Sequence, residues 1–143
     1  MRNKNKLIDK VRHDIRAELK LRKHIHAEPK LILDTEIWSI PPSVNHYWES
    51  NGGVKYICQD GLDFHELVKT IVPPLRTCSR LKLGVIFHFP DNRVRDIDNY
   101  LKATLDSLVK CGFCFDDEQF DELSVKRGEI VQGGLIKLNV WEF

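Results

Sequence analysis

The amino-acid sequence predicts an α/β (α+β) domain in which a small mixed β-sheet packs against helices, with an additional helix at the N-terminus. Two kinds of periodicity carry this prediction. Residues 81–89 place a large apolar side chain at every second position, which is typical of a strand with a buried face. Residues 64–72 instead repeat apolar side chains at helical spacing, which predicts a core-facing helix. Helix and strand patterns that alternate along one chain favour a layered domain.

The same patterns, together with the Gly and Pro breaks between them, predict the remaining elements. In chain order we expect a basic amphipathic helix at 6–21, a strand at 31–40, a hairpin closed by Gly52–Gly53, a helix at 64–72, a strand at 81–89, a helix from Asp98 or Asn99 to 110, a return strand at 113–117, and a hairpin of 123–131 with 135–141 closed at 132–134. His65 lies on the polar face of its helix and is expected to be solvated rather than catalytic.

Charge divides the 143 residues into two parts. Residues 1–33 hold ten Lys or Arg and four Asp or Glu, a net +6, whereas the other residues hold twelve and seventeen, a net −5. We therefore expect a basic amphipathic helical extension at 1–33 and one domain at 34–143. An acidic domain needs a local basic surface to bind DNA, because affinity for the duplex depends on neutralising phosphates. The extension either supplies part of that surface or packs its apolar stripe on the domain or on a second copy.

Cysteine usage and hydropathy indicate the compartment. The cysteines show no paired spacing beyond Cys111 and Cys114, which favours buried small side chains over zinc ligands. The N-terminal residues do not resemble a signal peptide, and no apolar run approaches the length of a membrane span. We expect a cytoplasmic protein, nucleoid-associated when bound to DNA, with no membrane partner.

The strongest chemical signal is the segment 93–102, Arg-Val-Arg-Asp-Ile-Asp-Asn-Tyr-Leu-Lys. In an extended backbone, alternate residues point to the same side, so Asp96 and Asp98 can present two carboxylates together while Ile97 faces the core. Lys102 follows Asp98 by four residues and is expected to project near these carboxylates, one helical turn further on.

The pair Asp116–Asp117 is expected on a strand that returns along this helix. Lys110 and Gly112 are typical of the last turn and the C-cap of a helix. Extended at roughly 3.3 Å per residue, 113–117 would run back along a helix that rises about 1.5 Å per residue. Strand parity then puts Asp117 on the helix side and leaves Asp116 facing solvent or capping the next turn.

Carboxylates gathered in this way need a cation among them, because like charges resist joint ionisation. With no Cys or His in the cluster, a hard ion such as Mg²⁺, or Mn²⁺, fits better than zinc, and this combination is typical of phosphoryl-transfer chemistry. Taken alone, Asp96-Ile97-Asp98-Asn99 can be a capping and turn sequence, and Asp116-Asp117-Glu118 can be a solvated acidic loop. The combination of the motifs favours the metal site.

Several motifs resemble, in order and spacing, those of RusA-type Holliday junction resolvases, over about residues 35–143. They are Pro41-Pro42-Ser43-Val44-Asn45-His46-Tyr47-Trp48, Phe89-Pro90-Asp91, Arg95-Asp96-Ile97-Asp98-Asn99 with Lys102, Leu105-Asp106-Ser107-Leu108, Gly112-Phe113 and Asp116-Asp117. The resemblance implies a homodimer of small α/β subunits that nicks four-way DNA junctions symmetrically. It also implies that Asp96, Asp98 and Asp117 bind Mg²⁺ and that Lys102 is needed for cleavage.

Five further residues are candidates for DNA contact. Arg93 and Arg95 flank the acidic motif, where they can bind phosphates or merely neutralise the carboxylates. Asn45 belongs to a stretch that the resemblance places by the active site, and Lys126 and Arg127 lie on the strand expected at 123–131. The predicted function is a Mg²⁺-dependent, structure-selective endodeoxyribonuclease that resolves four-way junctions in recombination and repair. The alternative is a non-catalytic junction-binding protein that retains the fold.

Overall fold

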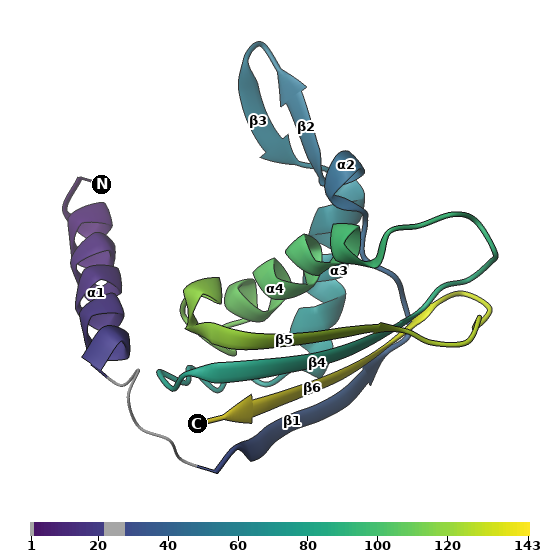
Figure 1. The fold of residues 1–143 in the computed structure, drawn as a ribbon. Coiled ribbons are helices and arrows are strands. Elements are labelled where there is room, and N and C mark those ends of the chain that lie inside the picture. Colours follow the sequence, from purple (N-terminus) through teal and green to yellow (C-terminus); the bar gives the residue numbers. More distant parts are fainter. Residues whose placement is uncertain (1, 22–27) are drawn as a thin grey trace.

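The computed structural model describes residues 2–21 and 28–143 and contains a mixed four-stranded sheet in the order β1-β6-β4-β5 (Figure 1). The strands are β1 (Lys30–Ile37), β4 (Leu81–His88), β5 (Phe120–Arg127) and β6 (Leu135–Glu142). β6 pairs antiparallel with both β1 and β4, whereas β4 and β5 are parallel. The predicted mixed sheet of an α/β domain is confirmed, and β1 crosses the expected domain boundary at residue 34.

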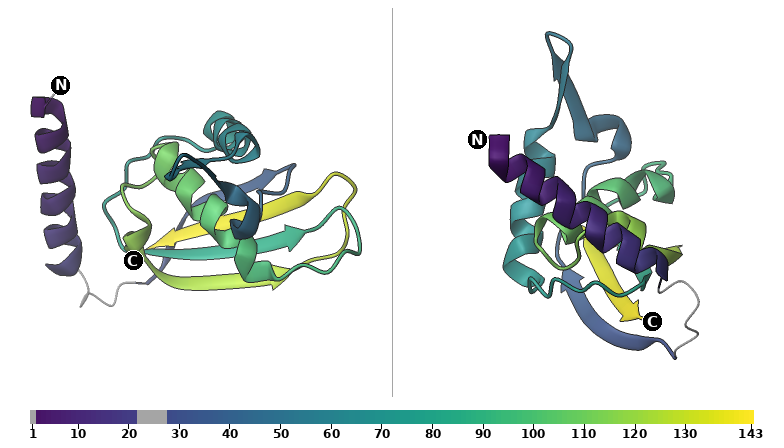
Figure 2. Two further views of the ribbon diagram at one scale, coloured as in Figure 1. Left: turned by 90° about the horizontal axis from the view of Figure 1, so that it is seen from above. Right: turned by 90° about the vertical axis from the view of Figure 1, so that its left-hand side faces the viewer.

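Two helices, α3 (Gln59–Ile71) and α4 (Leu101–Lys110), lie on the same face of the sheet (Figure 2). Every second side chain of β4 is buried, as its apolar alternation predicts. These side chains meet the apolar faces of the two helices in one core, which includes Val68, Phe87, Leu108 and Phe113. The core therefore holds α4 rigidly above the sheet, and this helix carries Lys102.

Because β4 and β5 are parallel, the chain between them must cross over, and α4 is the crossover helix. A turn of 3-10 helix, η2 (Ile97–Tyr100), leads into α4, and a second one, η3 (Asp117–Gln119), precedes β5. The loop after β4 and the connection from β5 to β6 lie at the same end of the sheet (Figure 1). One acidic motif, with Asp96 and Asp98, therefore precedes the crossover helix, and the other, with Asp116 and Asp117, follows it.

The prediction of a return strand at 113–117 was wrong. Gly112 has φ of 81°, as expected for a C-cap, but the chain then turns inward and buries Phe113 beneath α4. The backbone N–H of Phe113 donates to Leu108 O over 3.1 Å, and only an isolated bridge joins Cys114 to Thr77. The segment is a loop because its first aromatic side chain enters the core, and the strand begins only at Phe120.

The prediction of a C-terminal hairpin was also wrong in its pairing. β5 and β6 form near the expected residues, but β4 lies between them. Leu83, for example, pairs with Leu123 of β5 on one side and with Val140 of β6 on the other. Periodicity identifies a strand and its buried face, but a central strand such as β4 takes partners from distant segments.

Three other elements match the prediction. The helix α1 (Arg2–Leu21) forms where the basic amphipathic helix was expected, and a hairpin of β2 (Trp48–Asn51) and β3 (Val54–Ile57) turns at Gly52 and Gly53. Both glycines have positive φ, 58° and 81°, which this tight turn requires. A short helix, α2 (Val44–Tyr47), precedes the hairpin, which projects away from the sheet (Figure 1).

No helix in the described part of the chain is long and apolar enough to cross a membrane. The cysteines Cys58, Cys111 and Cys114 are buried and free, and Cys78 is free and half-buried.

Candidate active site

The acidic motif after β4 presents its two aspartates to solvent. Asp96 has extended backbone angles, φ −87° and ψ 124°, and both Asp96 and Asp98 are exposed, while Ile97 between them packs against the core. This is the predicted alternation. The helical turn begins at Ile97, so its N-cap is Asp96 rather than Asp98 or Asn99, and the Asp96 side chain makes no capping hydrogen bond. Its carboxylate therefore stays available for a ligand.

Lys102 lies between two carboxylates that come from different elements. Its ammonium Nζ donates to Asp106 Oδ1 over 2.9 Å and is 3.7 Å from Asp117 Oδ2. The hydrogen bond from Lys102 to Asp106 raises the pKa of the lysine, although partial burial opposes this, and Asp117 adds to the increase. Lys102 is therefore positively charged at neutral pH. The sequence predicted the approach of Lys102 to Asp117 but not the contact with Asp106.

The two neighbouring aspartates of the second motif face different partners. Asp117 faces Lys102, whereas Asp116 Oδ2 accepts from Arg16 Nη2 of α1 over 2.8 Å, and its Oδ1 accepts from the N–H of Glu118 over 3.0 Å. Asp116 is the N-cap of η3, as one of the two predicted alternatives requires. The choice of Asp117 over Asp116 as the residue facing the lysine is confirmed, although no strand produces it.

The two carboxyl groups also differ in pKa. Burial raises the pKa of Asp117, and the neighbouring Asp116 and Asp106 add to this increase, which Lys102 opposes. For Asp116, burial acts in the same direction, but hydrogen bonds from the Glu118 N–H and from Arg16 outweigh it and lower the pKa. Asp116 thus keeps its charge in a local structural role, while the negative charge on Asp117 lacks full compensation.

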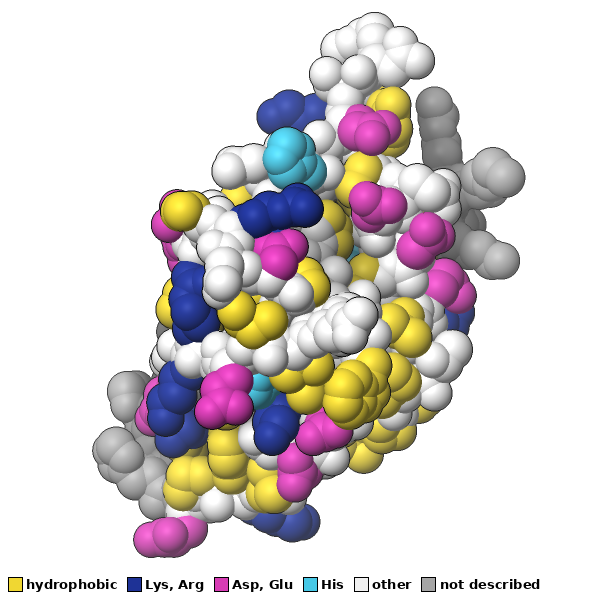
Figure 3. Space-filling model, turned by 90° about the vertical axis from the view of Figure 1, so that its right-hand side faces the viewer, with side chains coloured by type: hydrophobic (Ala, Val, Ile, Leu, Met, Phe, Trp, Pro, Cys, Tyr) yellow, Lys and Arg dark blue, Asp and Glu magenta, His cyan; other side chains and the backbone are white. Residues whose placement is uncertain are grey.

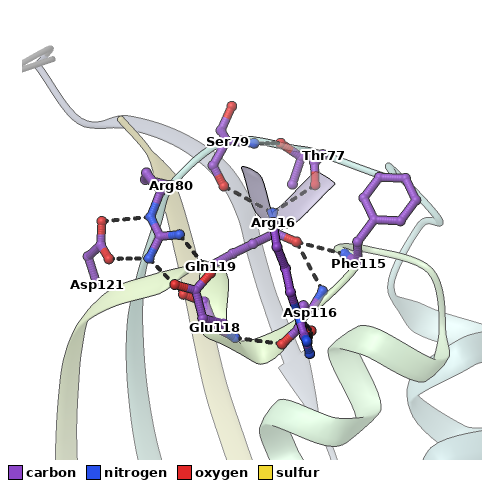
Figure 4. Close-up of polar contacts among 9 residues, drawn as sticks. All are labelled: Arg16, Thr77, Ser79, Arg80, Phe115, Asp116, Glu118, Gln119 and Asp121. Carbon is purple, nitrogen blue, oxygen red and sulfur yellow. Dashed lines mark hydrogen bonds and ion pairs between the residues drawn. The ribbon is translucent and has the colours of Figure 1, made fainter. Parts of the chain in front are cut away.

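The loop that carries Asp117 is fastened from beneath by Gln119, which is fully buried (Figure 4). Gln119 Oε1 accepts from the N–H groups of Phe115 and Asp116 over 2.8 and 3.0 Å. Its Nε2 donates to the carbonyl oxygens of Thr77 and Ser79 over 2.9 and 3.0 Å. One side chain therefore ties the loop to the segment that leads into β4. The sequence interpretation treated Gln119 as part of a polar turn.

Arg80 fastens the other side of this loop (Figure 4). Its buried guanidinium pairs with the carboxylates of Asp121 and Glu118 and also donates to the Glu118 carbonyl oxygen. Charge-assisted bonds of this kind are stronger than neutral ones. Asp117 therefore sits on a rigid support.

The structure brings together only part of the predicted carboxylate cluster. Within residues 2–21 and 28–143, no three His, Cys, Asp or Glu side chains lie close enough together to hold a metal ion. Lys102 and Asp117 meet, whereas Asp96 and Asp98 do not join Asp117 in one cluster. Asp98 precedes Lys102 by one turn, whereas Asp106 contacts that lysine from the next turn of α4 and Asp117 contacts it from η3. As a donor set, three carboxylates nevertheless fit a hard divalent cation such as Mg²⁺.

A buried polar chain lies behind Asp106. Asp106 Oδ2 accepts from the Tyr47 hydroxyl over 3.0 Å, and this hydroxyl is 2.6 Å from Nε2 of His65. The other ring nitrogen of His65, Nδ1, is 2.6 Å from the Ser107 Oγ. The prediction that His65 is solvated was wrong, since it is only 6% exposed, because this face of α3 packs against α4. The residue spacing that signals a helix face does not reveal such a distant polar partner.

Comparison with known proteins identifies the family. The family model described as endodeoxyribonuclease RusA matches residues 39–138. The chain belongs to the RusA family. A crossover junction endodeoxyribonuclease of Enterobacteria phage HK97 is 44% identical over 106 residues, which are 71% of this chain and 88% of that protein. Proteins of the same name from Enterobacteria phage 82 and Escherichia coli K12 are 33% and 31% identical over the same shares.

The loop between β4 and the acidic motif of this RusA family member is shaped by Arg95. Its guanidinium donates to Asp91 Oδ1 over 2.6 Å and lies 5.2 Å from the centre of the Phe89 ring, and the Arg95 side chain is 13% exposed. The hydrogen bond from Arg95, with another from the Arg93 N–H, holds the pKa of Asp91 at about 2. Arg127 contacts the other side of this loop, where it donates to Arg95 O and lies 4.9 Å from the Phe89 ring centre.

The remaining candidates for DNA contact are more open. Arg93 is 81% exposed, and Lys126 and Asn45 also face solvent. Asn45 belongs to α2, which packs against η2 and α4, so it lies on the same side of the RusA domain as the acidic motif. At this end of the sheet, Lys and Arg side chains alternate with Asp and Glu rather than forming one basic field (Figure 3).

The helix α1 lies outside the region that matches the RusA family model, yet it borders the site. Arg12 and Arg16 line a cavity of about 540 Å³ together with Lys102 and Asp117. Asp106, Asp116 and Lys110 also line this cavity, as do the apolar side chains of Trp48, Ile57, Val109 and Phe115. The basic extension therefore contributes to the wall of the candidate active site.

Proposed function

We propose that this protein is a Mg²⁺-dependent, structure-selective endodeoxyribonuclease that resolves four-way (Holliday) DNA junctions by paired symmetric nicks in recombination and repair. The observation that carries the proposal is the position of Lys102 beside Asp117 in a chain of the RusA family. The relatives named as crossover junction endodeoxyribonucleases support the choice of substrate, since the match covers 88% of their length.

Asp96, Asp98 and Asp117 would hold Mg²⁺, or Mn²⁺ in its place, through carboxylate oxygens. When bound, a divalent cation supplies Lewis-acid chemistry and activates water for attack on a phosphodiester. Lys102 is held beside Asp117 and offers a fixed positive charge to the negative charge that develops on the phosphate or on the leaving oxygen. Asp116 is kept out of this role by its capping bond and by Arg16.

The DNA-binding surface in this proposal comprises Asn45, Arg93, Arg95, Lys126 and Arg127. The exposed side chains of Asn45, Arg93 and Lys126 would contact phosphates directly. Arg95 and Arg127 would act mainly by shaping the loop around Phe89 and by adding positive potential, because other contacts already hold their guanidinium groups.

A cleavage assay on a synthetic four-way junction, with and without Mg²⁺, tests the function. We expect paired nicks that need the cation and disappear when it is chelated. Asp98→Asn removes a charge and keeps the shape, so junction binding should persist or tighten, while cleavage falls by orders of magnitude. Binding without cleavage by the unaltered protein, at any divalent cation, would instead establish the non-catalytic junction-binding alternative.

We also propose that the basic extension, residues 1–33, adds to the DNA contacts of the domain at 34–143. Replacing Arg12 and Arg16 together with Ala should weaken junction binding and reduce the salt dependence of the affinity by up to about 1.8 in the log–log slope, for two phosphate contacts. Replacing Lys6 and Lys10 with Ala gives a matched control with the same charge change on the same helix. A slope for Arg12→Ala/Arg16→Ala that is unchanged from that of the unaltered protein would leave α1 as a packing or dimer element.

A dimer follows from the symmetry of the proposed substrate. A four-way junction with near two-fold symmetry needs opposed nicks, hence two active sites related by a two-fold axis. We expect light scattering to give a mass close to twice 16.7 kDa. The dimer would be contradicted if the protein were a monomer at concentrations at which it still makes both opposed nicks in one binding event.

The cytoplasm, and the nucleoid when DNA is bound, is the proposed location. Its support is that all four cysteines are free, as is usual in a reducing compartment.

A further inference from the structure

The buried side chains behind Lys102 form a continuous chain of short polar contacts across three helices. From the site inward, the contacts are Lys102 Nζ to Asp106 Oδ1 at 2.9 Å, Tyr47 Oη to Asp106 Oδ2 at 3.0 Å, Tyr47 Oη to His65 Nε2 at 2.6 Å, and His65 Nδ1 to Ser107 Oγ at 2.6 Å. Tyr47 is fully buried, and His65 and Ser107 are nearly so. Buried polar groups of this kind are normally satisfied and fixed in place.

Hydrogen-bond donors and acceptors define both ends of this chain. The Asp106 carboxylate can only accept, so the Tyr47 hydroxyl donates to it, and the Tyr47 oxygen also lies 2.6 Å from His65 Nε2. Burial, and also the positive charge of Lys110, lowers the pKa of His65, against the opposing effect of Asp106 and Glu66. At the far end, the Ser107 hydroxyl donates to the Ala103 carbonyl oxygen over 2.7 Å, so the Ser107 oxygen accepts from His65 Nδ1. The chain is therefore anchored at one end by the Asp106 carboxylate and at the other by the backbone of α4.

Tyr47 itself depends on a glycine for its position. A Cβ atom on Gly61 would lie 2.9 Å from Tyr47 Cε2 and 2.7 Å from Ile57 Cγ2, closer than side chains can approach. Gly61 lies within α3, where glycine in place of alanine destabilises a helix by about 1 kcal/mol. Glycine at this position thus makes α3 less stable but lets the tyrosine ring approach the backbone of the helix. A tyrosine ring that lay further from α3 would leave room for an alanine at position 61.

We infer that Tyr47, supported by His65 and Ser107, is a positioning residue that fixes the Asp106 carboxylate and, through it, the ammonium group of Lys102 beside Asp117. Asp106 has two oxygens with separate tasks: the one held by Tyr47 sets the orientation, and the other receives Lys102. Without the tyrosine hydroxyl, the carboxylate is free to rotate about its last bond, and Lys102 loses its fixed acceptor. This inference rests on the proposed function for its effect on the rate but not for its geometry.

Tyr47→Phe tests the inference, because it removes one oxygen and keeps the ring in the core. With the full-length protein and Mg²⁺, we expect kcat for junction cleavage to fall about 10- to 100-fold with KM and junction Kd unchanged, as for a misplaced catalytic group. Tyr56→Phe is the matched control, since Tyr56 lies on the projecting β3 and should leave kcat as it is. The inference would be overturned if Tyr47→Phe changed kcat no more than Tyr56→Phe does.

A second measurement keeps the test independent of catalysis. The ammonium signal of Lys102 in ¹H–¹⁵N NMR, assigned by its loss in Lys102→Arg, should shift and exchange faster in Tyr47→Phe but not in Tyr56→Phe. An unchanged signal would overturn the inference even if the rate fell. If Tyr47→Phe does not fold, Ser107→Ala at the far end of the chain should give a smaller change in the same two measurements. Inactivity of the unaltered protein would refute the proposed function alone, and the NMR comparison would still decide the positioning.

Discussion

Asp117→Asn is expected to abolish Mg²⁺-dependent cleavage while leaving the fold intact. The substitution removes the charge that faces Lys102 at 3.7 Å and a candidate ligand of the cation, but the loop remains fastened through Gln119 and Arg80. The rate should fall more than about 100-fold, equivalent to about 2.7 kcal/mol on the barrier. Cleavage under single-turnover conditions, with circular dichroism as the check on folding, measures this effect.

Asp116→Asn is the matched control for that experiment. Asparagine caps a helical turn as well as aspartate does, so η3 should persist, and only the exposed ion pair with Arg16 is lost. We expect a reduction in rate of less than about tenfold. Exchanged phenotypes for the two variants would assign the ligand to Asp116, and the orientation of this loop as described would then be wrong.

The largest effect on stability is expected from Gln119→Ala. This change leaves two backbone N–H groups and two carbonyl oxygens without their partner beneath the loop. Because buried polar groups that lose their hydrogen bonds are costly, the free energy of unfolding should fall by roughly 2–4 kcal/mol. Denaturant titration measures this change, and cleavage should fall as well, because Asp117 loses its rigid support.

Gln59→Ala provides the comparison, since Gln59 is exposed and its side chain donates to Asp63 one turn away. Its effect on the free energy of unfolding should stay within about 0.5 kcal/mol. Similar unfolding midpoints for Gln59→Ala and Gln119→Ala would mean that water replaces the partners of Gln119 without loss.

Local periodicity predicted the elements of this fold well but not their partners. The apolar alternation of β4 and the helical repeat of α3 depend on each segment alone, and both elements formed near the expected residues. The choice of β5 and β6 as the two neighbours of β4 depends on segments about 40 to 60 residues away, which no local pattern records. The prediction of a return strand was wrong for a different reason. Residues 113–117 alternate apolar and polar side chains as a strand does, but Phe113 is buried from a loop that pairs with no neighbouring strand over its length.

The candidate site was predictable where charge is unusual and unpredictable where polar residues are buried. Strand parity and the family motif both selected Asp117 as the aspartate facing Lys102, and Asp117 does face this lysine although the segment is a loop and not a strand. Asp106 and Tyr47 lie 59 residues apart, and each alone is an ordinary helical residue. Their partnership appears only when α2, α3 and α4 pack together.

The crossover between β4 and β5 also has a mechanical consequence. Lys102 and Asp106 lie one turn apart on α4, so the pitch of that helix sets their spacing, while Asp98 lies in the 3-10 turn η2 that leads into α4. Asp117 belongs to a second rigid body, the loop clamped to the sheet by Gln119 and Arg80. The distance from Asp98 to Asp117 is therefore set by how η2 and α4 pack against the clamped loop, and a substitution that loosens this packing would change that distance without altering either acidic motif.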